Sequence, residues 1–115
     1  MFTQVNRRVV SKMARPWDEL QTILQGIIGE GNSCYFQPPD DIYLTYPAIV
    51  YDLSNDDVDY ANNKKYRYMK RYEITIMTEE PDSDIPDRVG ELEYCRFVRH
   101  YSQNNLHHFI YEIYF

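Results

Sequence analysis

The chain has 115 residues, a formal net charge of -6 at pH 7 and a hydrophobic fraction of 43%. This length predicts a single domain over residues 1–115 that buries its core without disulfides or metal. The excess of acidic over basic residues argues against a general duplex-DNA binder. No apolar run reaches the roughly 20 residues that cross a bilayer, so we expect no membrane contact. The 12 tyrosines argue against disorder. Tyrosine has an apolar ring and a polar hydroxyl, so it suits interfaces that are partly exposed to water.

The number of cysteines indicates the redox environment in which the protein is expected to fold. Cys34 and Cys95 are the two cysteines, too few for a small secreted domain held together by disulfides. We therefore predict two free thiols in a reducing cytoplasm. The N-terminus has no apolar stretch followed by a small-residue cleavage site, so no signal peptide is expected.

Charge is unevenly placed along the chain. Residues 1–14 contain no acidic residue and are predicted to form a basic arm or a weak extension of the helix that follows, and the positive charge continues at Arg15. The acidity of the chain is concentrated after Arg71. This division suggests one surface that meets a positive partner or repels a negative one.

The first predicted element is a helix from about Pro16 to Gly29. Proline is tolerated in a first helical turn, and Asp18 and Glu19 favour the positive end of the helix dipole. Apolar residues then recur at helical spacing, and a glycine-rich sequence supplies the stop.

Extended chain is predicted over residues 42–53, after a loop at Pro38–Asp41. Pro47 cannot donate a ladder hydrogen bond, so it marks the start or the edge of a strand. The polar residues Ser54–Asn63 are predicted to form a long hairpin loop. The strongest strand pattern of the chain follows over Lys65–Thr78, where tyrosine and isoleucine alternate with more polar residues.

The last third of the chain predicts a turn, a helix and a hairpin. Glu79–Asp84 is an acidic turn, and its last residue is a plausible N-cap for a second helix over about Ile85–Val98. His100–Gln103 is then a short strand, Asn104-Asn105 a tight turn, and Leu106–Phe115 a strand. The resulting order, α-β-β-α-β-β, predicts an α+β domain with two helices packed on one face of an antiparallel sheet of about four strands.

Catalytic, metal and cofactor sites are not expected. His107 and His108 point to opposite faces of a strand, and no His-x-x-x-His or Cys-x-x-Cys spacing occurs. The acidic stretch Asp52–Asp59 suggests a calcium loop, but Asp57 occupies the position of the required glycine and Asn63 that of the bidentate glutamate. We therefore expect no enzyme and no cofactor.

The segment Lys64–Arg71 interleaves aromatic and basic side chains, as platforms for single-stranded nucleic acid do. In such a platform bases stack on the rings while cations follow the phosphates. The alternative is a strand whose tyrosine face packs on a helix and whose arginine face meets water or a neighbouring subunit. A nucleic-acid module would use Tyr66, Arg67, Tyr68, Lys70 and Arg71.

With these patterns assigned, the chain resembles the tail terminator, or tail completion, proteins of long-tailed bacteriophages. The resemblance rests on the Tyr-Pro-Ala-Ile-Val-Tyr strand at Tyr46–Tyr51 after a helix, and on a loop that leads into a long strand over Asp59–Ile76. A closing helix and hairpin then end in the aromatic strand Phe109–Phe115. The resemblance covers about residues 16–115, and related neck and head-completion proteins share similar patterns.

The resemblance implies a structural virion protein of the tail or neck, made in the host cytoplasm, that forms a ring, typically a hexamer. Such a ring caps the tail-tube protein, ends its polymerisation and joins the tail to a head connector or stopper, while genomic DNA passes through the lumen without specific binding. Acidic loops at Ser54–Asn63 and Glu79–Asp84 are candidate contacts or lumen linings. The candidate interface residues are Tyr66, Arg67, Tyr68, Arg71, Asp56, Asp57, Asp59, Glu79, Glu80, Asp82 and Asp84.

Overall fold

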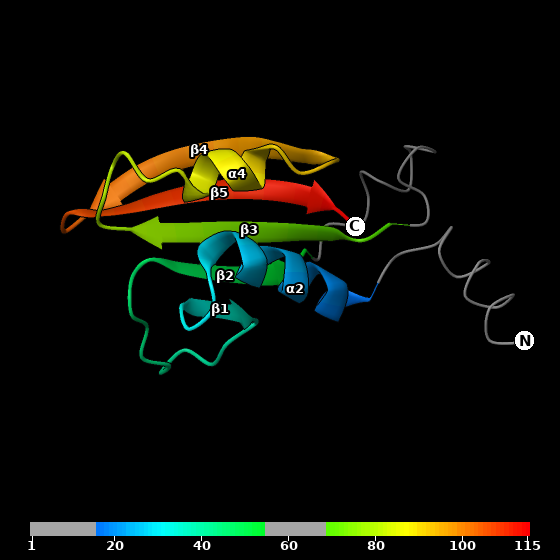
Figure 1. The fold of residues 1–115 in the computed structure, drawn as a ribbon, viewed down its shortest axis with the longest axis horizontal. Helices are drawn as coiled ribbons and strands as arrows, with labels where there is room; N and C mark the ends of the chain where they lie inside the picture. Colours follow the sequence, from blue (N-terminus) through cyan, green and yellow to red (C-terminus); the bar gives the residue numbers. More distant parts are fainter. Residues whose placement is uncertain (1–15, 55–68) are drawn as a thin grey trace, which may run out of the picture.

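The computed structural model describes residues 16–54 and 69–115, which adopt an α+β fold (Figure 1). The basic arm and most of the segment 64–71 lie outside the described residues. Within the described ranges, two helices cover one face of a five-stranded sheet. The elements in chain order are α2 (Trp17–Ile28), β1 (Ser33–Phe36), β2 (Ala48–Leu53), β3 (Arg71–Thr78), α4 (Ile85–Gly90), β4 (Cys95–Gln103) and β5 (Leu106–Tyr114).

The sheet has the strand order β1-β2-β3-β5-β4. β1 runs parallel to β2, whereas the other neighbouring pairs are antiparallel. The predicted α+β class is confirmed, but the sheet has one strand more than expected and is mixed. The extra strand is β1, whose four residues lie between a glycine-rich turn and two prolines. A strand this short carries no alternation long enough to detect in the sequence.

The helix predicted over Pro16–Gly29 is confirmed as α2. Its buried residues, Leu20, Leu24 and Ile28, recur at helical spacing. Gly29 follows the last helical residue with a φ of 101°, a left-handed value that glycine adopts without steric cost.

Only the second half of the predicted extended segment 42–53 is a strand. β2 begins at Ala48, directly after a cis peptide bond between Tyr46 and Pro47. The residues before this bond form no strand, and several of them lie over the sheet face that the helices leave uncovered. The prediction that Pro47 marks a strand start is therefore confirmed, while the strand assignment before it is wrong.

The second helix is much shorter than the predicted Ile85–Val98. α4 ends at Gly90, and β4 begins at Cys95 after Tyr94, whose φ is 62°. Pairing with β5 overrides the helical periodicity, because it satisfies backbone groups along a strand of nine residues. β4 is consequently far longer than the short strand expected at His100–Gln103.

Two local predictions for the second half of the chain are confirmed. Asp84 is the N-cap residue of α4, although its side chain makes no cap hydrogen bond. Asn104 and Asn105 form the tight turn between β4 and β5, with φ values of 55° and 63°. Asparagine tolerates this left-handed backbone conformation better than most residues do.

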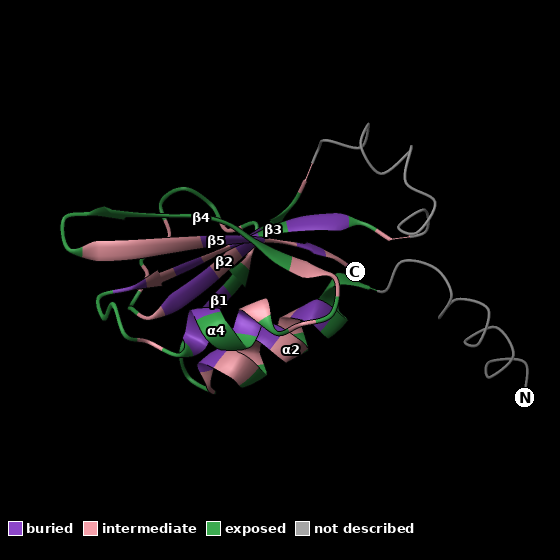
Figure 2. Ribbon diagram, turned by 90° about the horizontal axis from the view of Figure 1, so that it is seen from above, coloured by how far each residue is buried: buried purple, intermediate pink, exposed green. Residues whose placement is uncertain are grey.

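The hydrophobic core lies between the sheet and the two helices (Figure 2). β3 and β5 supply alternate side chains to this face, as their sequence alternation predicted. The core cluster consists of Leu20, Leu24, Ile28, Cys34, Ile49, Tyr51, Tyr72, Ile74, Ile76, Ile85, Val89, Tyr111, Ile113 and Phe115.

Because of Tyr51, the stability of this core is expected to fall at alkaline pH. Its hydroxyl donates a 2.6 Å hydrogen bond to Gln21 Oε1, and burial, followed by the nearby Cys34, Tyr72 and Asp18, raises the pKa of the phenol. An unfolded tyrosine loses its proton near pH 10. Because the folded pKa is the higher one, stabilisation is complete below about pH 10 and is lost as the pH rises further.

We expect Tyr51→Phe to lower the free energy of unfolding by about 1 kcal/mol at pH 7, through loss of the hydrogen bond. The same variant should lose less stability than the wild type between pH 9 and pH 11, a range set by the unfolded pKa of about 10. Urea unfolding across this pH range measures both effects. Tyr43→Phe, at a residue 86% exposed, is the matched control and should follow the wild-type curve.

Candidate interaction surface

β4 is the outermost strand of the sheet on the β5 side, and all its residues except Cys95 are exposed. The β4–β5 hairpin extends past both helices, so its far half is uncovered by either of them (Figures 1 and 2). No described residue pairs with the outer edge of β4. An uncovered strand edge presents backbone N–H and C=O groups that can pair with another chain.

The exposed side chains of β4 include large apolar groups. Phe97 is 51% exposed, and Val98 and Tyr101 are each 41% exposed. Phe97 is held edge-on against Tyr111 of β5, with ring centroids 5.4 Å apart. An irregularity between Phe97 and Arg99 shifts the pairing register, as a β-bulge does, and bulges re-aim side chains at sheet edges.

The hairpin also differs in charge from the rest of the described chain. Between Glu93 and Glu112 the sequence has no carboxylate, but it has two arginines and all three histidines. The guanidinium of Arg99 lies 5.6 Å from the ring centroid of Tyr101, and that ring stacks on His108 at 4.5 Å. The hairpin is therefore an aromatic surface with positive rather than negative charge.

The histidines fall on both faces of the hairpin. His107 and His108 pair with different residues of β4 and face opposite sides, as predicted. His100 Nε2 and His107 Nδ1 lie 3.0 Å apart across the two strands, a pairing that no sequence pattern predicts. Among the described residues, no group of three or more His, Cys, Asp or Glu side chains could hold a metal ion.

Arg71, a predicted interface residue, is buried at the start of the central strand β3. Its Nη1 lies 3.4 Å from Glu112 Oε2, and its Nε and Nη2 donate to Ser54 Oγ at 3.2 and 3.1 Å. Arg96 of β4 completes the group by donating to Glu112 Oε1 at 3.0 Å. Arg71 thus ties β3 to β5 and to the end of β2. The other predicted contacts in 55–68 lie outside the described residues: Asp56, Asp57, Asp59, Tyr66, Arg67 and Tyr68.

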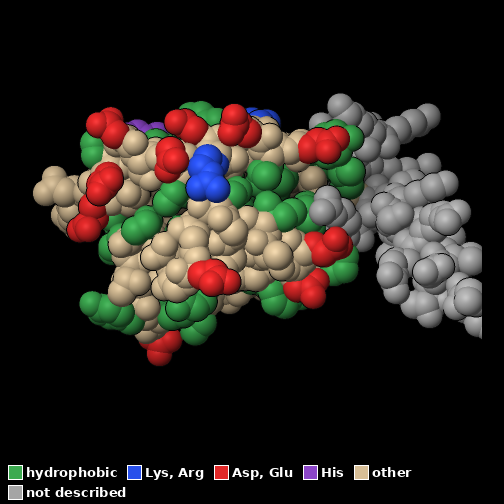
Figure 3. Space-filling view, in the orientation of Figure 1, with side chains coloured by type: hydrophobic (Ala, Val, Ile, Leu, Met, Phe, Trp, Pro, Cys, Tyr) green, Lys and Arg blue, Asp and Glu red, His purple; other side chains and the backbone are tan. Residues whose placement is uncertain are grey.

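The acidic turn after β3 is exposed as predicted, including Glu79, Glu80, Asp82 and Asp84. Further exposed carboxylates lie on and beside the helices, so the helix-covered face is acidic (Figure 3). Arg88 lies among these carboxylates, and its Nη1 donates a 3.0 Å hydrogen bond to the backbone oxygen of Ile27. The acidic surface and the hairpin surface are therefore different parts of one molecule with opposite charge.

Both cysteines are free thiols, as predicted. Burial raises the pKa of Cys34 to about 11, against a smaller opposing effect of a hydrogen bond from Gln21. Burial also raises the pKa of Cys95 to about 11. The thiolate, which is the nucleophilic form, is therefore scarce at both positions near neutral pH.

Comparison of the chain with protein-family models, curated proteins and solved structures finds no match. Within residues 16–54 and 69–115, no helix has both the length and the apolar character needed to cross a membrane.

Proposed function

We propose that this chain is a self-assembling structural subunit of the phage tail-terminator type, which forms a ring at the end of a tail tube. The observation that carries the proposal is the uncovered β4 edge with Phe97, Val98 and Tyr101 beside it. A long edge strand with exposed apolar side chains is an aggregation risk unless a partner covers it. A neighbouring subunit is such a partner.

Charge favours a contact between two different surfaces. The hairpin carries Arg96, Arg99 and the histidines, whereas the helix-covered face carries carboxylates. Complementary potentials of this kind steer association and fix its orientation. Contact between two unlike patches on identical subunits is heterologous and closes into a ring when the rotation permits.

In this proposal the subunits form a ring, typically a hexamer, in the virion tail or neck. The acidic turn is then placed to meet tail-tube protein or a head connector, or to line a lumen through which DNA passes without specific binding. Glu79, Glu80 and Asp82 are fully available for either role, since they are exposed.

The alternative of a single-strand nucleic-acid module receives no support from Arg71. That guanidinium is paired with Glu112 and Ser54 inside the sheet and is not presented to phosphate. The remaining residues of that platform lie mainly outside the described ranges, so the alternative stays a prediction.

Solution mass tests the proposal. Native mass spectrometry and sedimentation of the purified chain, alone and with tail tubes, should reveal a discrete ring. The double variant Phe97→Ser/Val98→Lys should weaken self-association by about tenfold or more, since buried interface anchors contribute at least 1–2 kcal/mol each. Lysine on an edge strand also opposes strand pairing.

Tyr43→Ser is the matched control, because Tyr43 is an 86% exposed aromatic residue in the segment between β1 and β2 and is not part of the hairpin. It should assemble like the wild type, and the double variant should still unfold cooperatively, at a temperature lowered by loss of the Phe97–Tyr111 contact. A monomer both alone and with tail tubes would contradict the proposal. Tight, strongly salt-dependent oligonucleotide binding by such a monomer would support the nucleic-acid module instead.

A further inference from the structure

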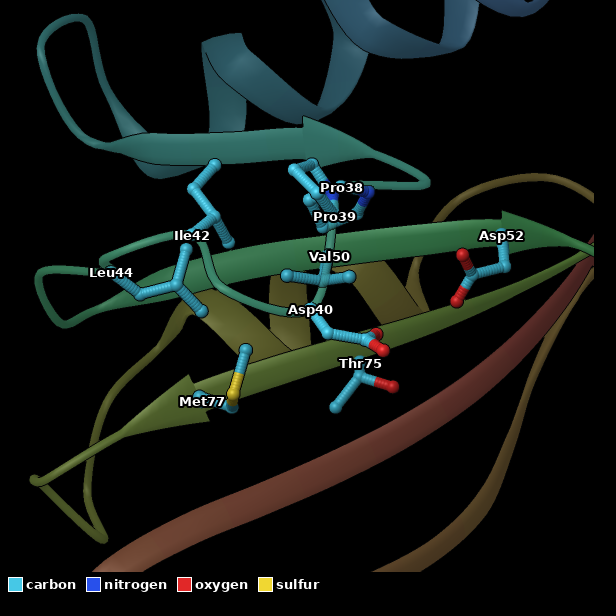
Figure 4. Close-up of a pocket in the computed structure, with 9 residues that line it drawn as sticks. All are labelled: Pro38, Pro39, Asp40, Ile42, Leu44, Val50, Asp52, Thr75 and Met77. Atoms are coloured by element: carbon cyan, nitrogen blue, oxygen red, sulfur yellow. The ribbon is translucent and has the colours of Figure 1, made fainter.

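A groove of about 380 Å³ lies on the sheet face opposite to the helices (Figure 4). The loop that follows β1 forms one wall, and side chains of β2 and β3 form the floor. Ile42, Leu44, Val50 and Met77 give the groove an apolar surface, and each of them is only partly buried. The groove is therefore an apolar channel that remains open to a ligand.

Two carboxylates, Asp40 and Asp52, line the same groove. Both are exposed, and neither forms an ion pair with any described cation. Asp52 also lies directly opposite Glu73 in the β2–β3 register. Like charges directly opposite each other destabilise a sheet, so a cation placed here would relieve the repulsion. The groove suits a chain segment that alternates aliphatic and positively charged side chains.

The basic arm of this chain has that composition. Its positive residues Arg7, Arg8 and Lys12 are interspersed with valines and a methionine, and it contains no acidic residue. Long basic side chains can lay an aliphatic stem along an apolar surface while the charged end reaches a carboxylate. The chemistry of the arm therefore matches both the floor and the acidic lining of the groove.

The arm joins the described chain at the start of α2, on the other face of the sheet from the groove, so it must pass around the β1 edge to reach the acidic lining. Trp17, at the start of α2, stacks on Phe36 with ring centroids 4.9 Å apart. Phe36 ends β1 two residues before Pro38 in the groove wall, and it pairs with Tyr51, the neighbour of Asp52. Residues 1–14 span up to ~45 Å when extended, so the arm can reach the whole groove.

We propose that the basic arm of each chain docks in this groove of the same chain, with its aliphatic side chains on the floor and its cations on Asp40 and Asp52. Two partly exposed ion pairs and a small apolar contact give a weak interaction on their own. A short tether raises the local concentration of the arm to the millimolar range, which allows a weak site to be occupied. The proposal does not depend on assembly into a ring.

Limited trypsin digestion of the full chain tests this docking, because trypsin cuts after Arg7, Arg8 and Lys12. Intact-mass measurements give the cleavage rate within the arm, relative to a free peptide of residues 1–14. We expect the arm to be protected in the wild type and to be cut about tenfold faster in Asp40→Asn/Asp52→Asn, a ratio that corresponds to about 1.4 kcal/mol.

The matched control is Asp82→Asn/Glu91→Gln, which removes the same charge from two exposed positions outside the groove. This control should keep the wild-type rate, and every variant should be at least as stable as the wild type in urea, since Asp52→Asn relieves the repulsion with Glu73. Equal acceleration in both double variants would overturn the proposal in favour of general electrostatic attraction. Cleavage at the free-peptide rate in the wild type would overturn it as well, as would protection that disappears on dilution, since that would assign the groove to another copy.

Discussion

Glu112→Gln is expected to lower the free energy of unfolding by about 2–3 kcal/mol, because it removes the carboxylate that lies 3.4 Å from the buried Arg71 guanidinium. The side chains of Arg71 and Glu112 are only 9% and 17% exposed, and the shape of residue 112 is nearly unchanged by the substitution. The effect is thus electrostatic rather than a packing defect. The hydrogen bonds from Arg71 to Ser54 remain in this variant. The expected loss of unfolding free energy is therefore below the 3–5 kcal/mol that is typical of a broken buried ion pair.

Two single variants are matched controls for Glu112→Gln. Arg96→Gln removes the other partner of Glu112, but the Arg96 side chain is 67% exposed, so the expected loss is below about 1 kcal/mol. Glu73→Gln should be neutral or slightly stabilising, since Glu73 pairs in register with both Asp52 and Glu112. Urea unfolding at pH 7 measures all three. An Arg96→Gln loss as large as that of Glu112→Gln would show that the exposed pair, not Arg71, stabilises the sheet.

Leu24→Ala is expected to cost about 3–4 kcal/mol of unfolding free energy. Leu24 is fully buried in the centre of α2, where it belongs to the cluster that joins the helix to the sheet. Removing its isobutyl group takes apolar surface out of the core and leaves a cavity, because the rigid sheet opposite cannot move in to fill it.

Thr22→Ala is the helix-surface control for Leu24→Ala. Thr22 is exposed, and its hydroxyl donates to the backbone oxygen of Asp18 within the same helix. Alanine has the higher helix propensity, so the unfolding free energy should stay within about 0.5 kcal/mol of wild type. If the two variants lost similar stability in urea, α2 would not be anchored through its apolar stripe.

Sequence patterns predicted the elements whose signals are local. The apolar stripe of α2 and the Asn104-Asn105 turn needed no information from the rest of the chain. β1 could not be predicted, because it forms through parallel pairing with residues more than ten positions away and through contacts with α2. Helical spacing from Ile85 onwards was misleading, since cross-strand pairing with β5 decides the conformation of Arg96, Phe97 and Val98.

The candidate surface was missed for the same reason. The helical spacing of Arg96–Val98 conceals the edge strand, and the Tyr/Arg pattern at Lys64–Arg71 is the more obvious interface pattern in the sequence. One signal in the sequence could have located the hairpin: the absence of carboxylates between Glu93 and Glu112 in an otherwise acidic region. Charge alone, without the strand pairing, does not show that these residues lie on an uncovered edge.

The position of β5 has a consequence for how the chain is made. β5 follows every other described strand in the sequence, yet it lies between β3 and β4 inside the sheet. During synthesis β4 therefore leaves the ribosome before the strand that connects it to the rest of the sheet. Until β5 inserts, Phe97 lacks Tyr111 and the Arg71 guanidinium lacks Glu112. The attachment of β4 to the rest of the sheet therefore depends on the strand that is made last among those described.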